Sequence, residues 1–177
     1  MEHPFDAITL ASLRRRHSAK WSRYAPDVLP AWVAEMDYPL ATPIRAALHA
    51  AVEADDCGYA DVTGLGAAFA PWAEAMWGWT VAPRDVRVVP DVVTGLTELL
   101  RLTTAPGDGV VIEPPVYAPF AGTVRALGRT VVTAPLVRTA AGFAPDLDAL
   151  ARAYAGGAKV HVLCSPHNPS GVVYARD

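Results

Sequence analysis

Short valine-rich runs alternate with amphipathic stretches through the second half of the chain. The apolar runs predict strands at 86–89, 110–112, 130–133 and 160–164. Helices are predicted between them, at 92–103, 117–127 and 147–154, because apolar residues such as Leu96, Leu99 and Leu100 recur at helical spacing. Strands that alternate with helices form parallel sheets. The pattern therefore predicts an α/β fold, with three layers (α/β/α) and a mostly parallel sheet.

The first half of the chain has a different pattern. Two helices are predicted there, at 43–54 with Thr42 as the N-cap and at 65–77, and a turn-rich segment separates them. Residues 1–40 show no sustained periodicity. We therefore expect an irregular and partly helical amino-terminal segment before the α/β core.

Composition limits the classes of protein that the chain can belong to. The 177 residues are 52% hydrophobic and 19% charged, which is typical of a folded domain with a large core. A net charge of −3 gives no reason to expect nucleic acid as a partner. Two cysteines far apart, no apolar run near the length of a membrane helix and no export signal at the amino terminus predict a cytoplasmic protein that does not bind membranes.

The segment Ser165-Pro-His-Asn-Pro-Ser-Gly171 follows the last predicted strand. Its prolines end the strand and stiffen the turn, so the Asn168 carboxamide projects from a rigid frame. Ligands of open α/β sheets bind outside the carboxyl ends of the strands. Asn168 is therefore a candidate ligand contact.

These residues resemble the Asn-Pro-x-Gly signature of fold-type I pyridoxal-phosphate (PLP) enzymes, in the class I/II aminotransferase superfamily. His167 makes the segment similar to the branch of MalY/PatB-type cystathionine β-lyases. Further segments resemble that branch in the same order: Lys20-Trp21, Leu29 to Pro39, Gly58-Tyr59, Pro90 to Gly95 and Glu113 to Tyr117.

The resemblance implies a set of site residues for the cofactor pyridoxal 5'-phosphate. The backbone N–H groups of Val93 and Thr94, at a helix start, would hold the phosphate. Tyr117 would stack on the pyridine ring, and Asn168 would donate its amide to the phenolic oxygen. Tyr59 would reach the phosphate of the neighbouring subunit in a homodimer. Without the resemblance, each of these residues also has an ordinary structural explanation.

The same resemblance implies that backbone N–H groups near Val33 and Ala34 bind the carboxylate of a small amino acid substrate. The neighbouring acids Glu35 and Asp37 are more typical of a solvated strand edge than of acid–base catalysis. His161, Cys164 and His167 cannot converge on one metal ion, because residues 161 and 164 face opposite sides of a strand. No metal site is predicted.

The family's Schiff-base lysine follows the Asn-Pro-x-Gly segment, and this chain has only Lys20 and Lys159, neither of which fits. We therefore expect the amino-terminal part of a longer enzyme, with residues 1–40 as an arm or part of a small domain and 41–177 as part of the PLP-binding domain. This part alone is expected to contain no catalytic residue and to be inactive, and it need not hold PLP.

For the whole protein, the resemblance implies a carbon–sulfur β-lyase of methionine biosynthesis that releases pyruvate, ammonia and a thiol. An amino acid aminotransferase and a non-catalytic domain that retains the fold are the alternatives.

Overall fold

The computed structural model describes residues 5–140 and 142–174. The chain divides into two compact units, Met1–Asp61 and Val62–Asp177. The predicted domain boundary near residue 40 stays a prediction about the whole protein. Among the described residues, no helix combines the length and the apolar character that crossing a membrane would need.

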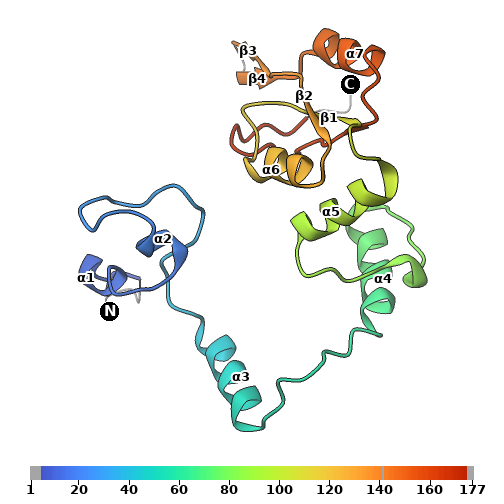
Figure 1. Ribbon diagram of the computed structural model, residues 1–177. Coiled ribbons are helices and arrows are strands. Elements are labelled where there is room, and N and C mark those ends of the chain that lie inside the picture. Colours follow the sequence, from blue (N-terminus) through green and yellow to red (C-terminus); the bar gives the residue numbers. More distant parts are fainter. Residues whose placement is uncertain (1–4, 141, 175–177) are drawn as a thin grey trace. The chain divides into compact units, whose positions relative to one another are not determined.

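The first unit is helical and irregular, as the sequence predicts. It contains the short helices α1 (Leu10–Leu13) and α2 (Ala19–Ser22) and the longer α3 (Thr42–Glu53) (Figure 1). Thr42 lies inside α3 and Ala41 is the N-cap residue, so the predicted Thr42 cap is wrong by one position. The cause is Pro43, which occupies the first turn, where a proline ring is tolerated because no N–H is needed.

The second unit contains the α/β core. It begins with α4 (Leu65–Trp77) and the 3-10 turn η1 (Pro83–Asp85), followed by α5 (Val92–Thr103). The sheet has three parallel strands in the order β2-β1-β5, with bounds β1 Gly109–Ile112, β2 Thr130–Thr133 and β5 Val160–His161. The helices α6 (Pro119–Ala126) and α7 (Leu147–Ala155) connect these strands (Figure 1). The predicted α/β fold with a parallel sheet is confirmed.

The strand order explains the layers. The chain goes from β1 outward to β2 through α6, and then returns past β1 to β5 through α7. Because crossovers between parallel strands are right-handed, two crossovers in opposite directions put their helices on opposite faces of the sheet. Helix α5 packs against α6 and therefore shares its face.

The core lies between the sheet and this pair of helices. Val110 and Ile112 of β1 are buried against Leu100 of α5 and Val124 of α6. Alternate residues of a strand point to the same face, so Val110 and Ile112 face the helices together. Burial of such side chains stabilises a fold by about 1.5–3 kcal/mol each.

Two strand predictions need correction. Residues 86–89 are extended but pair with no strand among the described residues, and Pro90, which ends the segment, has no N–H to donate. Strand β5 spans Val160–His161 and not 160–164, although the Val162 N–H still donates to the Val111 carbonyl at 2.9 Å. A hairpin was not predicted at all: β3 (Val137–Thr139) pairs antiparallel with β4 (Gly142–Ala144).

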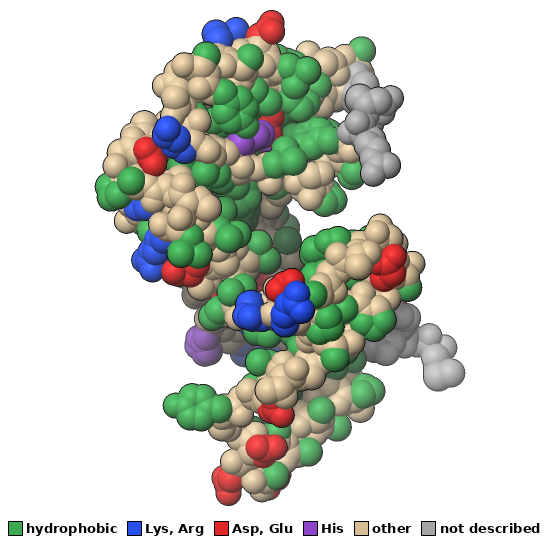
Figure 2. All heavy atoms as spheres, turned by 90° about the vertical axis from the view of Figure 1, so that its right-hand side faces the viewer, with side chains coloured by type: hydrophobic (Ala, Val, Ile, Leu, Met, Phe, Trp, Pro, Cys, Tyr) green, Lys and Arg blue, Asp and Glu red, His purple; other side chains and the backbone are tan. Residues whose placement is uncertain are grey.

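Apolar side chains also lie on the surface. Figure 2 shows them over much of the face that it presents, with charged side chains scattered among them. In the second unit, exposed examples are Leu99 and Leu102 of α5 and Leu163 after β5, with 61%, 82% and 57% of their surface accessible.

Candidate functional site

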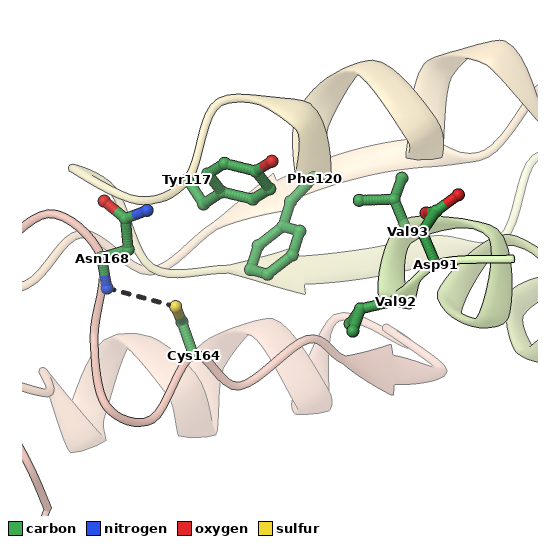
Figure 3. Close-up of a pocket in the computed structure, with 7 residues that line it drawn as sticks. All are labelled: Asp91, Val92, Val93, Tyr117, Phe120, Cys164 and Asn168. Atoms are coloured by element: carbon green, nitrogen blue, oxygen red, sulfur yellow. Dashed lines mark hydrogen bonds between the residues drawn. The ribbon is translucent and has the colours of Figure 1, made fainter. Parts of the chain in front are cut away.

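A cavity of about 550 Å³ opens at the carboxyl ends of β1 and β5 in the second unit. This volume is typical of sites for small molecules. The side chains come from the start of α5, the start of α6 and the turn after β5 (Figure 3). The lining residues are Asp91, Val92, Val93, Tyr117, Phe120, Cys164 and Asn168.

The turn after β5 holds Asn168 at one end of this cavity. The backbone N–H of Asn168 donates to Cys164 Sγ at 3.3 Å (Figure 3). The His167 N–H donates to the Val172 carbonyl at 2.7 Å, and the Gly171 N–H returns a bond of 2.7 Å to the His167 carbonyl. Gly171 has a φ of +73°, which favours glycine. These bonds leave the Asn168 side-chain amide free to face a ligand.

Two aromatic rings form the middle of the cavity. Tyr117 is 38% exposed and packs edge-to-face on Phe120, with ring centroids 5.5 Å apart. Such pairs fix ring orientation as well as burying area. The role of Phe120 was not predicted, although an aromatic residue one helical turn after Tyr117 was a readable signal. The Tyr117 ring therefore has a supported position and an accessible face.

The amino terminus of α5 forms the other end of the cavity. The Asp91 Oδ1 atom accepts the Thr94 N–H at 2.8 Å, and Asp91 Oδ2 accepts the Thr94 hydroxyl, also at 2.8 Å. The backbone bond from Thr94, then its hydroxyl bond, lowers the pKa of the Asp91 carboxyl. Val93 lines the cavity, whereas Thr94 lies next to it and faces Asp91. The sequence predicted the helix start but not the Asp91 cap.

A buried polar group lies near the Asn168 turn. Glu113, at the end of β1, is 1% exposed, and its Oε2 lies 3.1 Å from His161 Nε2. His167 is 2% exposed, and its ring packs edge-to-face near Tyr174. Burial raises the pKa of the Tyr174 hydroxyl, and the charge of Glu113 adds to this. Within the described residues, Glu113 Oε1, both ring nitrogens of His167 and the Tyr174 hydroxyl have no hydrogen-bond partner.

The remaining predicted site residues belong to the first unit. Val33 and Ala34 are exposed, and Tyr59 is fully exposed in the irregular segment after α3. Their predicted roles in binding a substrate and a partner subunit's phosphate stay predictions. The structure thus brings Val93, Tyr117 and Asn168 to one cavity, with Thr94 beside it.

The predicted solvated strand edge around Asp37 is wrong. Residues 35 and 37 lie in no strand, and Asp37 is the centre of a polar cluster. Its carboxylate accepts from Lys20 Nζ at 2.8 Å and from Trp21 Nε1 at 2.7 Å, while Arg16 donates to its backbone carbonyl at 2.8 Å. Lys20 also donates to the Glu35 carbonyl at 2.7 Å. Acids near tryptophans suggested solvation because their distant basic partners could not be read from local sequence.

The arrangement of the groups that line the cavity suits PLP. It offers an amide at one end, a tyrosine ring in the middle and a helix amino terminus at the other end (Figure 3). Helix amino termini stabilise phosphate, and aromatic faces stack on flat rings. Among the described residues that line the cavity, Asp91 is the one with a negative charge, which opposes an anion.

Comparisons with known proteins agree with this arrangement. Residues 35–177 match the family model "Aminotransferase class I and II". A putative cystathionine beta-lyase of Mycobacterium leprae is 41% identical over 97% of this chain, and cystathionine beta-lyase PatB of Bacillus subtilis is 34% identical over 90%. The chain spans 44% and 43% of the lengths of these two relatives.

A solved structure gives the same result for the fold. A putative PLP-dependent beta-cystathionase from Corynebacterium diphtheriae superposes with a TM-score of 0.79 at 31% identity, over 95% of this chain and 44% of that one. The family match, over residues 35–177, includes the α5 start, the Tyr117 segment and the Asn168 turn. This chain therefore belongs to the aminotransferase class I and II family.

Proposed function

We propose that the cavity binds PLP and that the chain is the amino-terminal part of a PLP-dependent carbon–sulfur β-lyase. The observation that carries this proposal is that Val93, Tyr117 and Asn168, predicted from three separate motifs, line one cavity of about 550 Å³. Val93 and Thr94 N–H groups would bind the phosphate, Tyr117 would stack on the ring, and Asn168 would donate to the phenolic oxygen.

The cofactor supplies an electron-accepting pyridine ring when it is bound. The protein residues have simpler tasks. The Asn168 amide donates a hydrogen bond that favours the anionic phenolic oxygen. Tyr117, supported by Phe120, covers one face of the ring and excludes water from it. The bond from the Asn168 backbone N–H to Cys164 Sγ helps to keep the donor in place before the ligand arrives.

The proposed reaction of the whole protein is the cleavage of cystathionine or a related cysteine S-conjugate. The Cβ–S bond breaks, one water molecule is consumed, and the products are a thiol, pyruvate and ammonia. The similarity to cystathionine beta-lyases supports this choice. By the same similarity, we propose a role in methionine biosynthesis in the cytoplasm.

We also propose roles for the first unit. Residues 1–40 would belong to an arm or small domain, with Val33 and Ala34 N–H groups binding the substrate carboxylate. Tyr59 would complete the site of the partner in a homodimer. The Schiff-base lysine is expected elsewhere in the whole protein, since Lys20 is bound to Asp37 and Lys159 precedes β5, at the opposite end from the cavity.

The cofactor proposal is tested by equilibrium titration of the whole apoprotein with PLP. Tyr117→Ala should weaken binding about twofold to tenfold, because an aromatic stacking contact contributes about 0.5–1.5 kcal/mol. Tyr154→Ala is the matched control, since Tyr154 is similarly exposed, at 47%, on α7 and does not line the cavity. Equal effects of the two substitutions would contradict the assignment of Tyr117.

The reaction is tested with the whole holoenzyme in two assays. Incubation with cystathionine should release a thiol and pyruvate in equal amounts. Incubation with an amino acid and a 2-oxo acid tests the aminotransferase alternative, for which the same cavity would serve. Rapid amino transfer without thiol release would overturn the lyase proposal, and inactivity in both assays with bound PLP would support a non-catalytic domain.

A further inference from the structure

The Asp91 carboxylate lies at the position proposed for the cofactor phosphate. Asp91 lines the cavity (Figure 3). Its two carboxylate oxygens accept the Thr94 N–H and the Thr94 hydroxyl, each at 2.8 Å. These are the donors that the phosphate would use on Thr94. A phosphate bound to Thr94 must therefore replace the Asp91 carboxylate, or share the helix terminus with it.

Within the described part of the chain, no cation forms an ion pair with the Asp91 carboxylate. The bonds from Thr94 lower the pKa of the carboxyl, so it is ionised at neutral pH. The positive end of a helix dipole stabilises one negative charge, and two anions at the same end repel each other.

Helix α7 has the same kind of aspartate N-cap at a position that does not line the cavity. Asp146 Oδ1 accepts the Ala149 N–H at 2.9 Å, which is the same capping bond that Asp91 makes. Ala149 has no hydroxyl, and Asp146 does not line the cavity. An aspartate N-cap therefore starts both helices, but only the one at α5 also lines the cavity.

We infer that Asp91 is a specificity-determining residue that competes with the ligand phosphate for the Thr94 donors. The inference rests on the proposed function and deepens it. Asp91 lowers the advantage of a phosphorylated ligand over the same ring without phosphate, and its side chain turns away from Thr94 when the phosphate binds. The competition concerns the phosphate alone, because Tyr117 and Asn168 contact the other parts of the ligand.

The test is a pair of titrations of the whole apoprotein, one with PLP and one with pyridoxal, which lacks the phosphate. Asp91→Asn keeps an oxygen for the Thr94 N–H but removes the charge. It should tighten PLP binding about threefold to tenfold, as expected for removing a like charge at a helix terminus. Pyridoxal binding should change less than about twofold, because pyridoxal has no charge at this end.

Two further variants complete the design. Asp146→Asn is the matched control and should leave both affinities unchanged. Asp91→Ser retains a neutral cap and should act in the same direction as Asp91→Asn, so the test survives if one variant folds poorly. Inorganic phosphate should also compete with PLP more effectively in both Asp91 variants than in the wild type.

The outcomes separate the two proposals. Unchanged or weaker PLP binding in both Asp91 variants would overturn the role of Asp91 while leaving the PLP site intact. An equal gain for PLP and pyridoxal would overturn it too, because the effect would not depend on phosphate. If the wild-type protein and all variants bind neither ligand, the proposed function itself fails, and the role of Asp91 fails with it.

Discussion

The two units of this chain are stabilised by different interactions. Apart from Pro30, the buried apolar side chains of the described residues all lie between Ala73 and Val162, in the second unit. In the described part of the first unit, the buried side chain with a charge is Lys20, which is 8% exposed and is bound to Asp37 and to the Glu35 carbonyl. The second unit thus depends on apolar packing, and the first depends on a polar cluster around Asp37.

The comparison teaches that motifs of one family can serve different purposes. Lys20-Trp21 and the Asp37 segment, which the sequence marks as family motifs, bind each other and hold the irregular segment that contains Val33 and Ala34. The motifs of the second unit instead line a cavity. Substitutions and changes of pH should therefore affect the two units differently.

The largest effect is expected from Leu100→Ala in the second unit. Leu100 is 1% exposed in the core between α5 and β1, and such truncations cost about 2–5 kcal/mol of unfolding free energy. Leu99→Ala on the same helix is the control, because Leu99 is 61% exposed. Chemical denaturation measures the loss, and hydrogen exchange should show it in residues 92–162. Equal loss of protection around Asp37 would contradict the division into two differently stabilised regions.

Gly66→Ala should cause the next largest loss of stability. A Cβ atom at Gly66 would lie 2.2 Å from the Pro83 carbonyl oxygen, so α4 and η1 would have to separate. Overpacking of this kind costs about 1–3 kcal/mol. Gly122→Ala on α6 is the control of opposite sign, because nothing lies within 4 Å of its added Cβ and alanine favours helix by about 1 kcal/mol. Thermal melts of both variants measure these changes. A Gly66→Ala variant with unchanged thermal stability would contradict the close contact between Gly66 and Pro83.

Asp37→Ala should break the first unit selectively. It removes the carboxylate acceptor of the buried Lys20 ammonium, which keeps the Glu35 carbonyl, and the acceptor of the Trp21 N–H, and this costs about 1–3 kcal/mol. Hydrogen exchange in residues 16–40 should rise, while the core around Leu100 stays protected. Asp27→Ala, at an exposed position of the same unit, should have little effect. A loss of protection confined to the second unit would contradict the dependence of the first unit on the polar cluster around Asp37.

The smallest effect is the acid sensitivity of the first unit. Burial alone would raise the pKa of the Asp37 carboxyl, but bonds from Lys20 and Trp21 and the charges of Lys20 and Arg16 together lower it. A lowered pKa stabilises the fold fully above the ordinary carboxyl pKa, and this contribution disappears as the pH falls through the lowered value. Protection of residues 16–40 should therefore decline below about pH 4 in the wild type.

Asp37→Asn provides the control for the acid effect. Its first unit should be weaker at neutral pH and should change less between pH 7 and pH 3, because no charge is lost at position 37. Asp91, whose pKa is also lowered, is present in both proteins and cancels in the comparison. Identical pH profiles of the two proteins would contradict a role for the Asp37 charge.

Several elements could be predicted from local sequence because local forces determine them. Helix α5 begins and ends where the leucine spacing predicts, and α4 also has its predicted bounds. The 86–89 run failed as a strand because pairing depends on a neighbour, which periodicity does not reveal. The β3–β4 hairpin was missed because its strands are three residues long and include charged and small residues.

The site was predictable to the extent that its residues belong to motifs. Asn168, Tyr117 and Val93 follow from segments with recognisable prolines and helix starts. Phe120 lies outside these segments, and Asp91 lies within the Pro90–Gly95 segment but had no predicted role. Their importance comes from what they face: Phe120 supports Tyr117, and Asp91 holds the Thr94 donors. Neither contact changes the periodicity or the composition of the chain.

The sequence by itself determined the α/β class, the helices with strong apolar periodicity and the stiff turn that presents Asn168. These follow from the spacing of apolar side chains and from proline and glycine geometry, which act over a few residues. The tertiary structure alone decided that Asp37 is bound by Arg16, Lys20 and Trp21, and that Asp91 meets the same cavity as Asn168. Contacts between residues far apart depend on how the elements pack, and electrostatic interactions depend on the distances that this packing creates.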